Sequence, residues 1–225
     1  MSFSPAPTRP AVEALVRSSL FRQLGHAAPV APAPTLVVNS SARHMHISPE
    51  NLETLFGAGA KLTVHKWLYQ EGQFAAEQTV TLIGPRRRVI PNLRILGPCR
   101  NLTQIELAIT DAIQLGVDLP VRMSGDIKGT PGGYVMGPKG MLEMPDGLIR
   151  AARHVHMSPS DAVFYGVKHL DRITLKVTSP YCNTRFDDLI ARVDPSFKLE
   201  VHMDTDEANA CDLERATKVE LFKIQ

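Results

Sequence analysis

The sequence of 225 residues contains few cysteines and few aromatic residues, and neither sign of charge predominates. The three cysteines, Cys99, Cys182 and Cys211, lie far apart, and no two of them form a C-x-x-C pair. An odd number of isolated cysteines argues against a disulfide framework and against a thiolate zinc site. It favours a reducing compartment.

Long apolar segments are also missing. No run approaches the roughly 18 apolar residues of a membrane-spanning helix, and the N-terminus lacks the apolar core of a secretory signal. The 25 basic and 23 acidic residues leave a formal net charge of +2, which gives no sign of a nucleic-acid-binding surface. We therefore expect a cytoplasmic globular protein with no membrane or nucleic-acid partner, in one large or two small domains.

Residues 1–34 differ in composition from the rest. An amphipathic pattern at residues 11–24 predicts a short helix with one apolar stripe, and residues 25–34 form a Pro/Ala-rich run typical of a semi-rigid linker. An isolated helix of about 14 residues is only marginally stable in water. It must dock either on its own domain or, as the linker favours, on a separate partner.

From Thr35 onward the sequence is rich in short β-type segments. Gly84-Pro85 and Gly137-Pro138 mark turns between such segments. Many short strands with few short helices predict a mainly β fold of sheets or small barrels, not a doubly wound α/β fold. The predicted strands are residues 36–39, 62–68, 79–83, 89–96, 104–109, 134–136, 141–144, 173–177, 189–193, 198–203 and 218–224.

One heptapeptide occurs twice, as Arg43–Pro49 and Arg153–Pro159, with the arginine, both histidines, the serine and the proline in common. Each copy leads into a short helical segment. Serine as N-cap, proline at the first helical position, and Gly57 or Gly166 at the end are helix start and stop signals. The sequence therefore predicts two related halves.

Five of the eight histidines lie in H-x-H or H-x-D patterns. In an extended segment, residues i and i+2 point to the same face, so two imidazoles can converge on one ion at about 2.0–2.1 Å. One such pair alone is more often a pair of half-exposed polar residues. Two copies in the same context favour zinc ligands, with an open position for a carbonyl, a thiolate or an anion. The histidines are His44, His46, His154, His156 and His202.

Three further features suit a metal or an anion. Glu106 lies on the polar face of a predicted strand and is the best candidate for an oxygen ligand, although a solvated strand face has the same pattern. Arg100 ends a predicted turn, and its guanidinium fork suits phosphate, but a surface arginine is the alternative. Residues 124–133 form a glycine-rich loop whose N–H groups can approach an anion, as many ordinary loops can.

Six blocks of the sequence resemble the signature blocks of the PduL-type phosphotransacylases, the phosphate propanoyltransferase family of bacterial microcompartments. The resemblance covers about residues 35–213. It implies two small β-barrel domains built from a duplicated unit, a di-zinc centre, and interconversion of acyl-CoA and phosphate with acyl phosphate and CoA. The blocks are residues 43–49, 73–76, 96–100, 124–132, 152–159 and 203–210.

The resemblance also implies site residues and domain boundaries. Residues 35–43 and 151–225 would form the first barrel and residues 44–150 the second. One zinc would be held by His44, His46 and Glu106, and the other by His154, His156 and His202. Arg100 and Ser124 would be the catalytic residues near phosphate. Coenzyme A contacts would come from Ser41, Lys66, Arg94, Leu96 and Asn209.

The implied reaction proceeds without an acyl-enzyme. Phosphate, oriented by one zinc and Arg100, attacks the thioester carbonyl while the other zinc stabilises the thiolate, with propanoyl or acetyl as the expected acyl group. Residues 1–24 would be an encapsulation peptide that binds the shell or the core enzymes of a microcompartment, so we expect the enzyme in its lumen as a homo-oligomer, a dimer or larger.

Three other functions fit parts of the pattern. A zinc-dependent thioester or phosphoester hydrolase could use the same ligands, and phosphate-dependent consumption of acyl-CoA distinguishes it from a transferase. A non-catalytic zinc-stabilised module would tolerate loss of Arg100. A microcompartment shell protein fits less well than cargo, because the body is dense in candidate ligands and the N-terminal helix is separable.

Overall fold

Two β-sheets make up most of the computed structural model, which describes residues 13, 16 and 33–223. The residues from Thr35 on form one compact unit. The predicted helix at residues 11–24 lies outside the described residues except for Glu13 and Val16, and most of the 25–34 linker does too. Within the described residues, no helix combines the length and apolarity that a membrane crossing needs.

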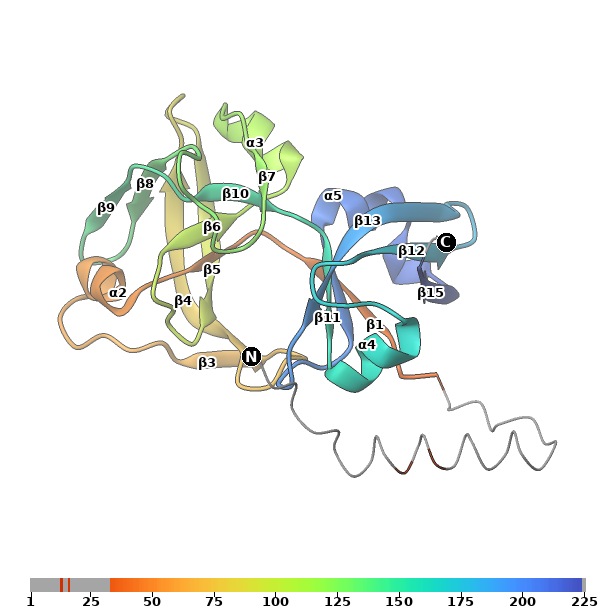
Figure 1. Ribbon diagram of the computed structural model, residues 1–225. Coiled ribbons are helices and arrows are strands. Elements are labelled where there is room, and N and C mark those ends of the chain that lie inside the picture. The colour runs from red at the N-terminus through yellow and green to blue at the C-terminus, as the bar shows by residue number, and fades with distance from the viewer. Residues whose placement is uncertain (1–12, 14–15, 17–32, 224–225) are drawn as a thin grey trace. The chain divides into compact units, whose positions relative to one another are not determined.

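The larger sheet has nine strands. Their bounds are β2 (His44–His46), β3 (Val64–Trp67), β4 (Phe74–Ile83), β5 (Val89–Gly97), β6 (Gln104–Glu106), β7 (Val121–Arg122), β8 (Gly133–Met136), β9 (Met141–Met144) and β10 (Leu148–Ala151). Their order is β7-β10-β6-β2-β5-β4-β8-β9, and β3 pairs with β4 beside this path. Figure 1 shows β4 and β5 as the long strands of this sheet.

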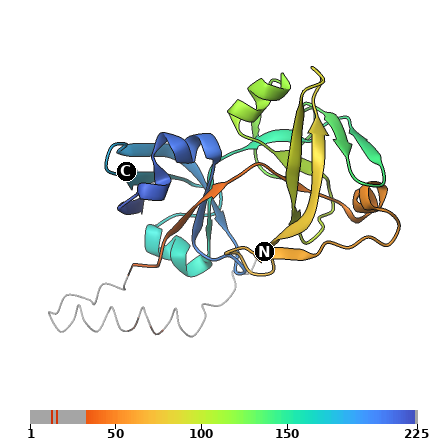
Figure 2. The ribbon, with the colours of Figure 1, turned by 180° about the vertical axis from the view of Figure 1, so that it is seen from behind.

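The smaller sheet has six strands, of which the first comes from the start of the described chain. Its strands are β1 (Val37–Ser41), β11 (His154–Met157), β12 (Arg172–Thr178), β13 (Thr184–Val193), β14 (Glu200–Asp204) and β15 (Lys218–Phe222), in the order β1-β14-β11-β13-β12-β15. β1 runs parallel to β14. The chain therefore leaves this sheet after β1 and returns to it at β11, as both views show (Figures 1 and 2).

Each sheet covers its own hydrophobic core. Leu82, Ile90 and Ile95 are fully buried under the larger sheet, and Leu175 and Val201 are fully buried under the smaller one. Burying such a side chain contributes about 1.5–3 kcal/mol. The predicted mainly β architecture is confirmed as two curled sheets. Within the described strands the two ends of each sheet are not paired with each other, so closure into barrels stays a prediction.

The helices that follow the two heptapeptides begin and end as predicted. They are α2 (Pro49–Phe56) and α4 (Pro159–Tyr165), and each starts with its proline. The hydroxyls of Ser48 and Ser158 accept hydrogen bonds from the backbone N–H of the third residue of each helix, at 3.3 and 3.2 Å. Gly166 has φ +64°, which favours glycine at the helix end.

Some predicted strands are too long, and two helices were not predicted. The strand predicted at residues 104–109 ends at Glu106, and α3 (Ile109–Leu115) follows. The Asp111 carboxylate accepts from the N–H of Ala108 at 3.1 Å and caps the helix start. α5 (Thr205–Ala210) begins in the same way, because Asp204 and Glu207 cap each other's backbone N–H groups.

Partly buried ion pairs connect the two sheets. Arg150 on β10 donates to Asp204 at 2.6 Å and to Glu207 at 2.8 Å, and Arg153, which precedes β11, also donates to Glu207 at 2.7 Å. On another side, Gln70 donates to Glu200 at 2.6 Å. Charge-assisted hydrogen bonds of this length are the strong ones. They fix α5 and β14 of the smaller sheet against segments of the larger one.

Candidate functional site

The first ligand cluster lies on β2 and β6 of the larger sheet, where His44 stands opposite Glu106. The Nε2 atoms of His44 and His46 are 3.2 Å apart. Glu106 oxygens lie 3.5 Å from the Nε2 of His44 and 3.8 Å from that of His46. Ligands bound at about 2.0–2.2 Å to a tetrahedral zinc are roughly 3.3–3.5 Å apart. The three side chains therefore converge at a spacing that fits one ion.

The second cluster lies on β11 and β14 of the smaller sheet, where His154 stands opposite His202. Ligand atoms of His154, His156 and His202 lie within 4.8 Å of one another. Both ring nitrogens of His156 are buried without a hydrogen-bond partner, and the Nε2 of His202 lies 3.1 Å from Glu200 Oε2. An unsatisfied buried polar atom costs about 1–3 kcal/mol, and a bound cation would remove that cost for one of the two His156 nitrogens.

The first histidine of each heptapeptide bonds to the backbone carbonyl of the residue two positions before it. Nδ1 of His44 is 2.8 Å from the carbonyl oxygen of Ala42, and Nδ1 of His154 is 2.8 Å from that of Ala152. Because a carbonyl can only accept, Nδ1 carries the proton and donates. The Nε2 lone pair of each ring then faces its cluster, as in histidines that bind metal.

Three histidines of the two clusters, His46, His154 and His156, favour the neutral form that binds metal. Burial lowers the pKa of His46 to about 2, and the charge of His44 adds to the effect. Burial, followed by repulsion from His202, lowers the pKa of His156 to about 2 and that of His154 to about 4. Burial opposes ionisation of Glu106, but His44 and His46 lower its pKa to about 2 overall. Neutral imidazoles and a carboxylate are the forms that ligate zinc.

Gln104, which was not predicted as a site residue, connects the first cluster to the glycine-rich loop. Its fully buried side chain donates to Glu106 at 2.7 Å and to the Ser124 hydroxyl at 2.6 Å. Its carbonyl oxygen accepts from the N–H of Gly125 at 2.8 Å, where φ is +101° and favours glycine. The predicted residue Ser124 is thus held beside Glu106.

Arg100 lies close enough to both clusters to affect their charge. Its backbone N–H donates to the Ile47 carbonyl at 2.9 Å, directly after the first heptapeptide's histidines. Its guanidinium lowers the pKa of both His46 and His156. Burial lowers the pKa of Arg100 itself, while Glu106 raises it. The predicted phosphate-binding arginine therefore lies near histidines of both sheets.

Arg192 is a second basic residue at the site, and it was not predicted. It stands beside His156, because β13 runs parallel to β11 in that register. The Phe197 ring stacks on His156 with centroids 4.0 Å apart, and the Arg192 guanidinium lies 5.9 Å from the Phe197 ring. The sequence around Arg192 gave no signal, since one basic residue in a strand is ordinary.

The residues predicted to contact coenzyme A fall into two groups. Ser41, Arg94 and Leu96 lie next to the first cluster: the Ser41 hydroxyl is 3.5 Å from His44 Nδ1, and Arg94 stands beside His44 in register. The Arg94 guanidinium donates to the carbonyls of residues 76 and 77. Lys66 on β3 and Asn209 on α5 are exposed.

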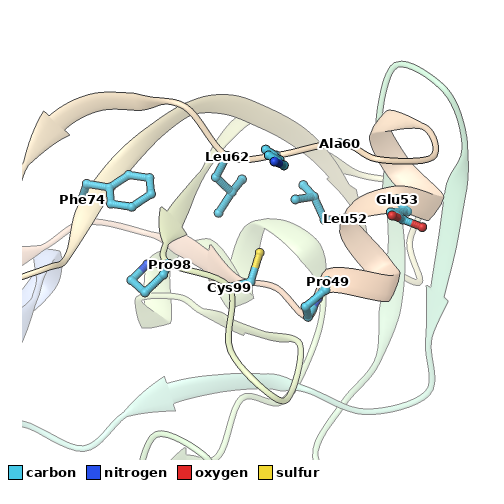
Figure 3. Close-up of a pocket in the computed structure, with 9 residues that line it drawn as sticks. Pro49, Leu52, Glu53, Ala60, Leu62, Phe74, Pro98 and Cys99 are labelled. Carbon is cyan, nitrogen blue, oxygen red and sulfur yellow. The ribbon is translucent and has the colours of Figure 1, made fainter.

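A mostly apolar cavity of ≈ 330 Å³ lies beside the turn that leads to Arg100 (Figure 3). Leu52, Leu62, Phe74 and Cys99 are among its lining residues, and none of the predicted ligands is. Burial raises the pKa of the Cys99 thiol, so the thiol stays protonated at neutral pH and is a poor nucleophile. Cys99 therefore gives no support for a covalent acyl-enzyme.

Comparison with known proteins gives a consistent result over most of the chain. Residues 37–214 match a family model described as phosphate propanoyltransferase. The chain is 54% identical to a phosphate propanoyltransferase from Planctopirus limnophila, over 96% of this chain and 92% of the relative. Enzymes of the same name from Thermotoga maritima and Salmonella typhimurium are 52% and 46% identical, over 80% of this chain and 85% and 83% of the relatives.

Proposed function

The chain belongs to the phosphate propanoyltransferase family and is a phosphate acyltransferase, and we propose that it converts acyl-CoA and phosphate to acyl phosphate and CoA, and the reverse, by direct zinc-assisted attack. The observation that carries the zinc part of this proposal is the pair of clusters with converging ring nitrogens and an ionised Glu106.

Each cluster offers three candidate ligands and would leave a fourth position open on a bound zinc, as catalytic zinc sites do. His44, His46 and Glu106 would hold one ion, and His154, His156 and His202 the other. Bound zinc would supply positive charge for the phosphate oxygens and for the departing thiolate. The unpartnered ring nitrogens of buried His156 support this assignment.

The chain's own residues orient the nucleophile. Arg100 offers a permanent charge and a planar fork of donors, which suits two oxygens of phosphate. Ser124, held by Gln104 at 2.6 Å, presents a hydroxyl beside Glu106. A phosphate oxygen would bond to the thioester carbonyl carbon as the C–S bond breaks, so the acyl group passes directly to phosphate and CoA leaves as the thiolate.

The acyl group is propanoyl or acetyl in this proposal, and the name shared by the relatives favours propanoyl. Ser41, Arg94 and Leu96, which lie beside the first cluster, would contact the part of coenzyme A nearest the thioester. Lys66 and Asn209 are exposed, and they would contact its outer part.

A thiol-release assay on zinc-loaded enzyme tests the function. With propanoyl-CoA or acetyl-CoA, free CoA should form only when phosphate is present, and it should form in equal amount to acyl phosphate. CoA release at the same rate without phosphate would identify a thioester hydrolase instead. Elemental analysis should find about two zinc ions per chain, and active protein without bound transition metal would refute the zinc assignment.

The remaining proposals concern organisation. We place residues 35–43 and 151–225 in one barrel-like domain and residues 44–150 in the other; the two separate cores and the pairing of β1 with β14 support this division. Assembly into a dimer or larger homo-oligomer is part of the same proposal. Size-exclusion chromatography with light scattering checks it, and a monomer at working concentration would contradict it.

Residues 1–24 would be the encapsulation peptide that brings the enzyme into a microcompartment lumen. The match to the Planctopirus relative leaves about nine residues of this chain outside it, fewer than the 34 that precede Thr35, so it extends into this segment. Deleting residues 1–34 should leave activity intact and abolish co-purification with shells. A truncated enzyme that still enters shells, or that unfolds, would contradict this role.

A further inference from the structure

Two half-buried arginines at the candidate site lack a carboxylate partner. Among the described residues, no carboxylate lies within ion-pair distance of Arg100 or Arg192. By contrast, Arg150 and Arg153 are paired with acidic residues at 2.6–2.8 Å. Because a buried charge is costly unless it is paired, the two free guanidiniums call for an anion from outside the chain.

The register of the smaller sheet places Arg192 on the face of the second cluster. Partners in a strand ladder point to the same side of the sheet, and Arg192 is the partner of His156. The Phe197 ring contacts both side chains, stacking on His156 and lying under the guanidinium. This contact restricts the long arginine side chain and favours one direction for its donors.

Arg192 and Arg100 act on a common region. Arg192 lowers the pKa of Arg100, although burial has the larger effect. The backbone geometry agrees with this: the Arg100 N–H donates to the carbonyl of Ile47, the residue after His46, and Arg192 is the register partner of His156. Arg100 therefore adjoins the first cluster and Arg192 the second.

We propose that Arg192 is a second anion-binding residue of the active site and holds the attacking phosphate together with Arg100. The inference rests on the proposed function. A phosphate dianion has enough acceptor oxygens for two guanidinium forks. Held from both sheets, it would be fixed in rotation as well as in position, which directs one oxygen at the thioester carbon. No covalent step is added to the reaction.

The phosphate groups of coenzyme A offer the same chemistry, so the experiment must separate the two sources. Arg192→Gln removes the charge and keeps a polar side chain, whereas Arg192→Lys keeps the charge and loses the fork. Arg185→Gln is the matched control, because Arg185 lies on the same strand, half exposed, and pairs with Asp187. Zinc content is measured for every variant.

Initial rates are recorded against phosphate at saturating propanoyl-CoA, and against propanoyl-CoA at saturating phosphate. Arg192→Gln should lower kcat/KM for phosphate about 10- to 100-fold and change KM for propanoyl-CoA less than twofold. Arg192→Lys should recover part of the loss, and Arg185→Gln should match the wild type. Calorimetric titration with inorganic phosphate alone, without acyl-CoA, should show the same weakening.

Three outcomes would overturn the inference. Unchanged phosphate binding and kcat/KM in both Arg192 variants would remove the residue from the phosphate site. A rise confined to KM for propanoyl-CoA would assign it to coenzyme A. Loss of zinc or of the folded state in both variants would make its role structural. If the wild type releases CoA without phosphate, the proposed function itself fails, whatever Arg192 does.

Discussion

The two halves of the chain are built on the same local unit. In the larger sheet, β2 lies between β5, which is parallel to it, and β6, which is antiparallel. In the smaller sheet, β11 lies between the parallel β13 and the antiparallel β14. Each central strand carries the heptapeptide's H-x-H pair and leads into a helix capped by serine. Duplication thus accounts for the placement of both histidine pairs.

The halves differ in the residues that stand opposite the two histidines. Each half has a carboxylate at one of these two positions, but not at the same one. Opposite the first histidine stands Glu106 in one half and His202 in the other. Opposite the second histidine stands Gln104 in one half and Glu200 in the other. At these two positions each half therefore has one carboxylate. Glu106 belongs to the first ligand cluster, whereas Glu200 lies outside the three-histidine cluster.

This exchange would give the two proposed ions different charge. A His₂Glu set neutralises one charge of a divalent ion, whereas a His₃ set neutralises none. The three-histidine site would therefore attract a thiolate or phosphate more strongly. The comparison teaches that a repeated strand unit can fix ligand geometry twice while single register positions set the charge of each site.

The arginine that stands beside a histidine also occupies a different register position in each half. Arg94 stands beside the first histidine of its half, where the other half has Ile190. Arg192 stands beside the second histidine of its half, and continuing the β2–β5 register by one residue places Leu96 at that position. Nη1 of Arg94 donates to two backbone carbonyls, whereas among the described residues the Arg192 guanidinium has no carboxylate within ion-pair distance.

Removing the first histidine of each pair should produce the largest effect. His44→Ala and His154→Ala each delete one of three ligands, and we expect each to lower activity by about 100-fold or more, since even losing an outer-shell partner costs 10–100-fold. Each variant should retain about one zinc ion, measured by elemental analysis. Near-normal activity in a variant that lacks one ion would make that site structural and would break the functional equivalence of the halves.

Local sequence patterns predicted the central elements of both halves well. The structure of the heptapeptide follows from its own residues: alternation directs both histidines to one face, and serine and proline start the helix. The alternation of Gln104, Ile105 and Glu106 predicted that Glu106 lies on a polar strand face, and its grouping with the histidines came from the family resemblance; the register places it opposite His44. All eleven predicted strands coincide with an observed strand, although their ends differ.

What was missed depends on pairing between distant segments. Gln104 and Arg192 are ordinary residues in sequence, and only the register against β2 and β11 brings them to the clusters. The helix α3 was not predicted, and the strand before it was extended to Ile109, because the N-cap of α3 is an alanine and the capping carboxylate comes from Asp111. The pairing of β1 with β14 has no local signal and came from the family resemblance.

Replacing the Glu200 carboxylate by an amide should have the next largest effect. Glu200 is buried and its Oε2 lies 3.1 Å from Nε2 of His202, and it also accepts from Gln70 at 2.6 Å. Since such partners orient ligating histidines, Glu200→Gln should weaken zinc binding at the three-histidine cluster about 10–100-fold. Competition with a chromophoric chelator measures the two affinities separately.

The matched change in the other half is Gln104→Glu. It places a second carboxylate at the 2.7 Å contact with Glu106 and removes the N–H donor to Ser124. It should therefore change the zinc affinity of the His44–His46–Glu106 cluster only. If either variant weakened both affinities equally, the two halves would be coupled, not independent.

Acid should destabilise the metal-free protein through the lowered histidine pKa values. Below pH 6.5 the unfolded chain binds protons that buried His46, His154 and His156 do not, so the free energy of unfolding falls as pH falls. Each imidazole contributes up to about 1.4 kcal/mol per pH unit. The effect ends near pH 4 for His154 and near pH 2 for His46 and His156.

Urea unfolding of chelator-treated protein at pH 7.5, 6.5 and 5.5 measures this slope. The C-terminal half has two such histidines and the N-terminal half one, so His156→Gln and His154→Gln together should flatten the slope about twice as much as His46→Gln. Equal flattening by the two sets would contradict the difference between the halves.

The smallest expected difference lies in the helix caps. Ser158 and Asp161 form a complete capping box: the Ser158 hydroxyl accepts from the Asp161 N–H at 3.2 Å, and the Asp161 carboxylate accepts from the Ser158 N–H and hydroxyl at 3.0 and 2.7 Å. The Ser48 hydroxyl accepts from the Asn51 N–H at 3.3 Å, while the Ser48 N–H donates to the Thr103 hydroxyl and not to a carboxylate of its own helix. Replacing a capping serine by alanine costs about 0.5–2 kcal/mol. We expect Ser158→Ala near the upper end of that range and Ser48→Ala near the lower end, measured by urea unfolding of the zinc-loaded enzyme. Both variants should keep their zinc, because neither hydroxyl contacts a cluster. Equal losses would mean that the Asp161 side of the box adds nothing, and the two repeats would then be equivalent at their helix starts as well as at their histidines.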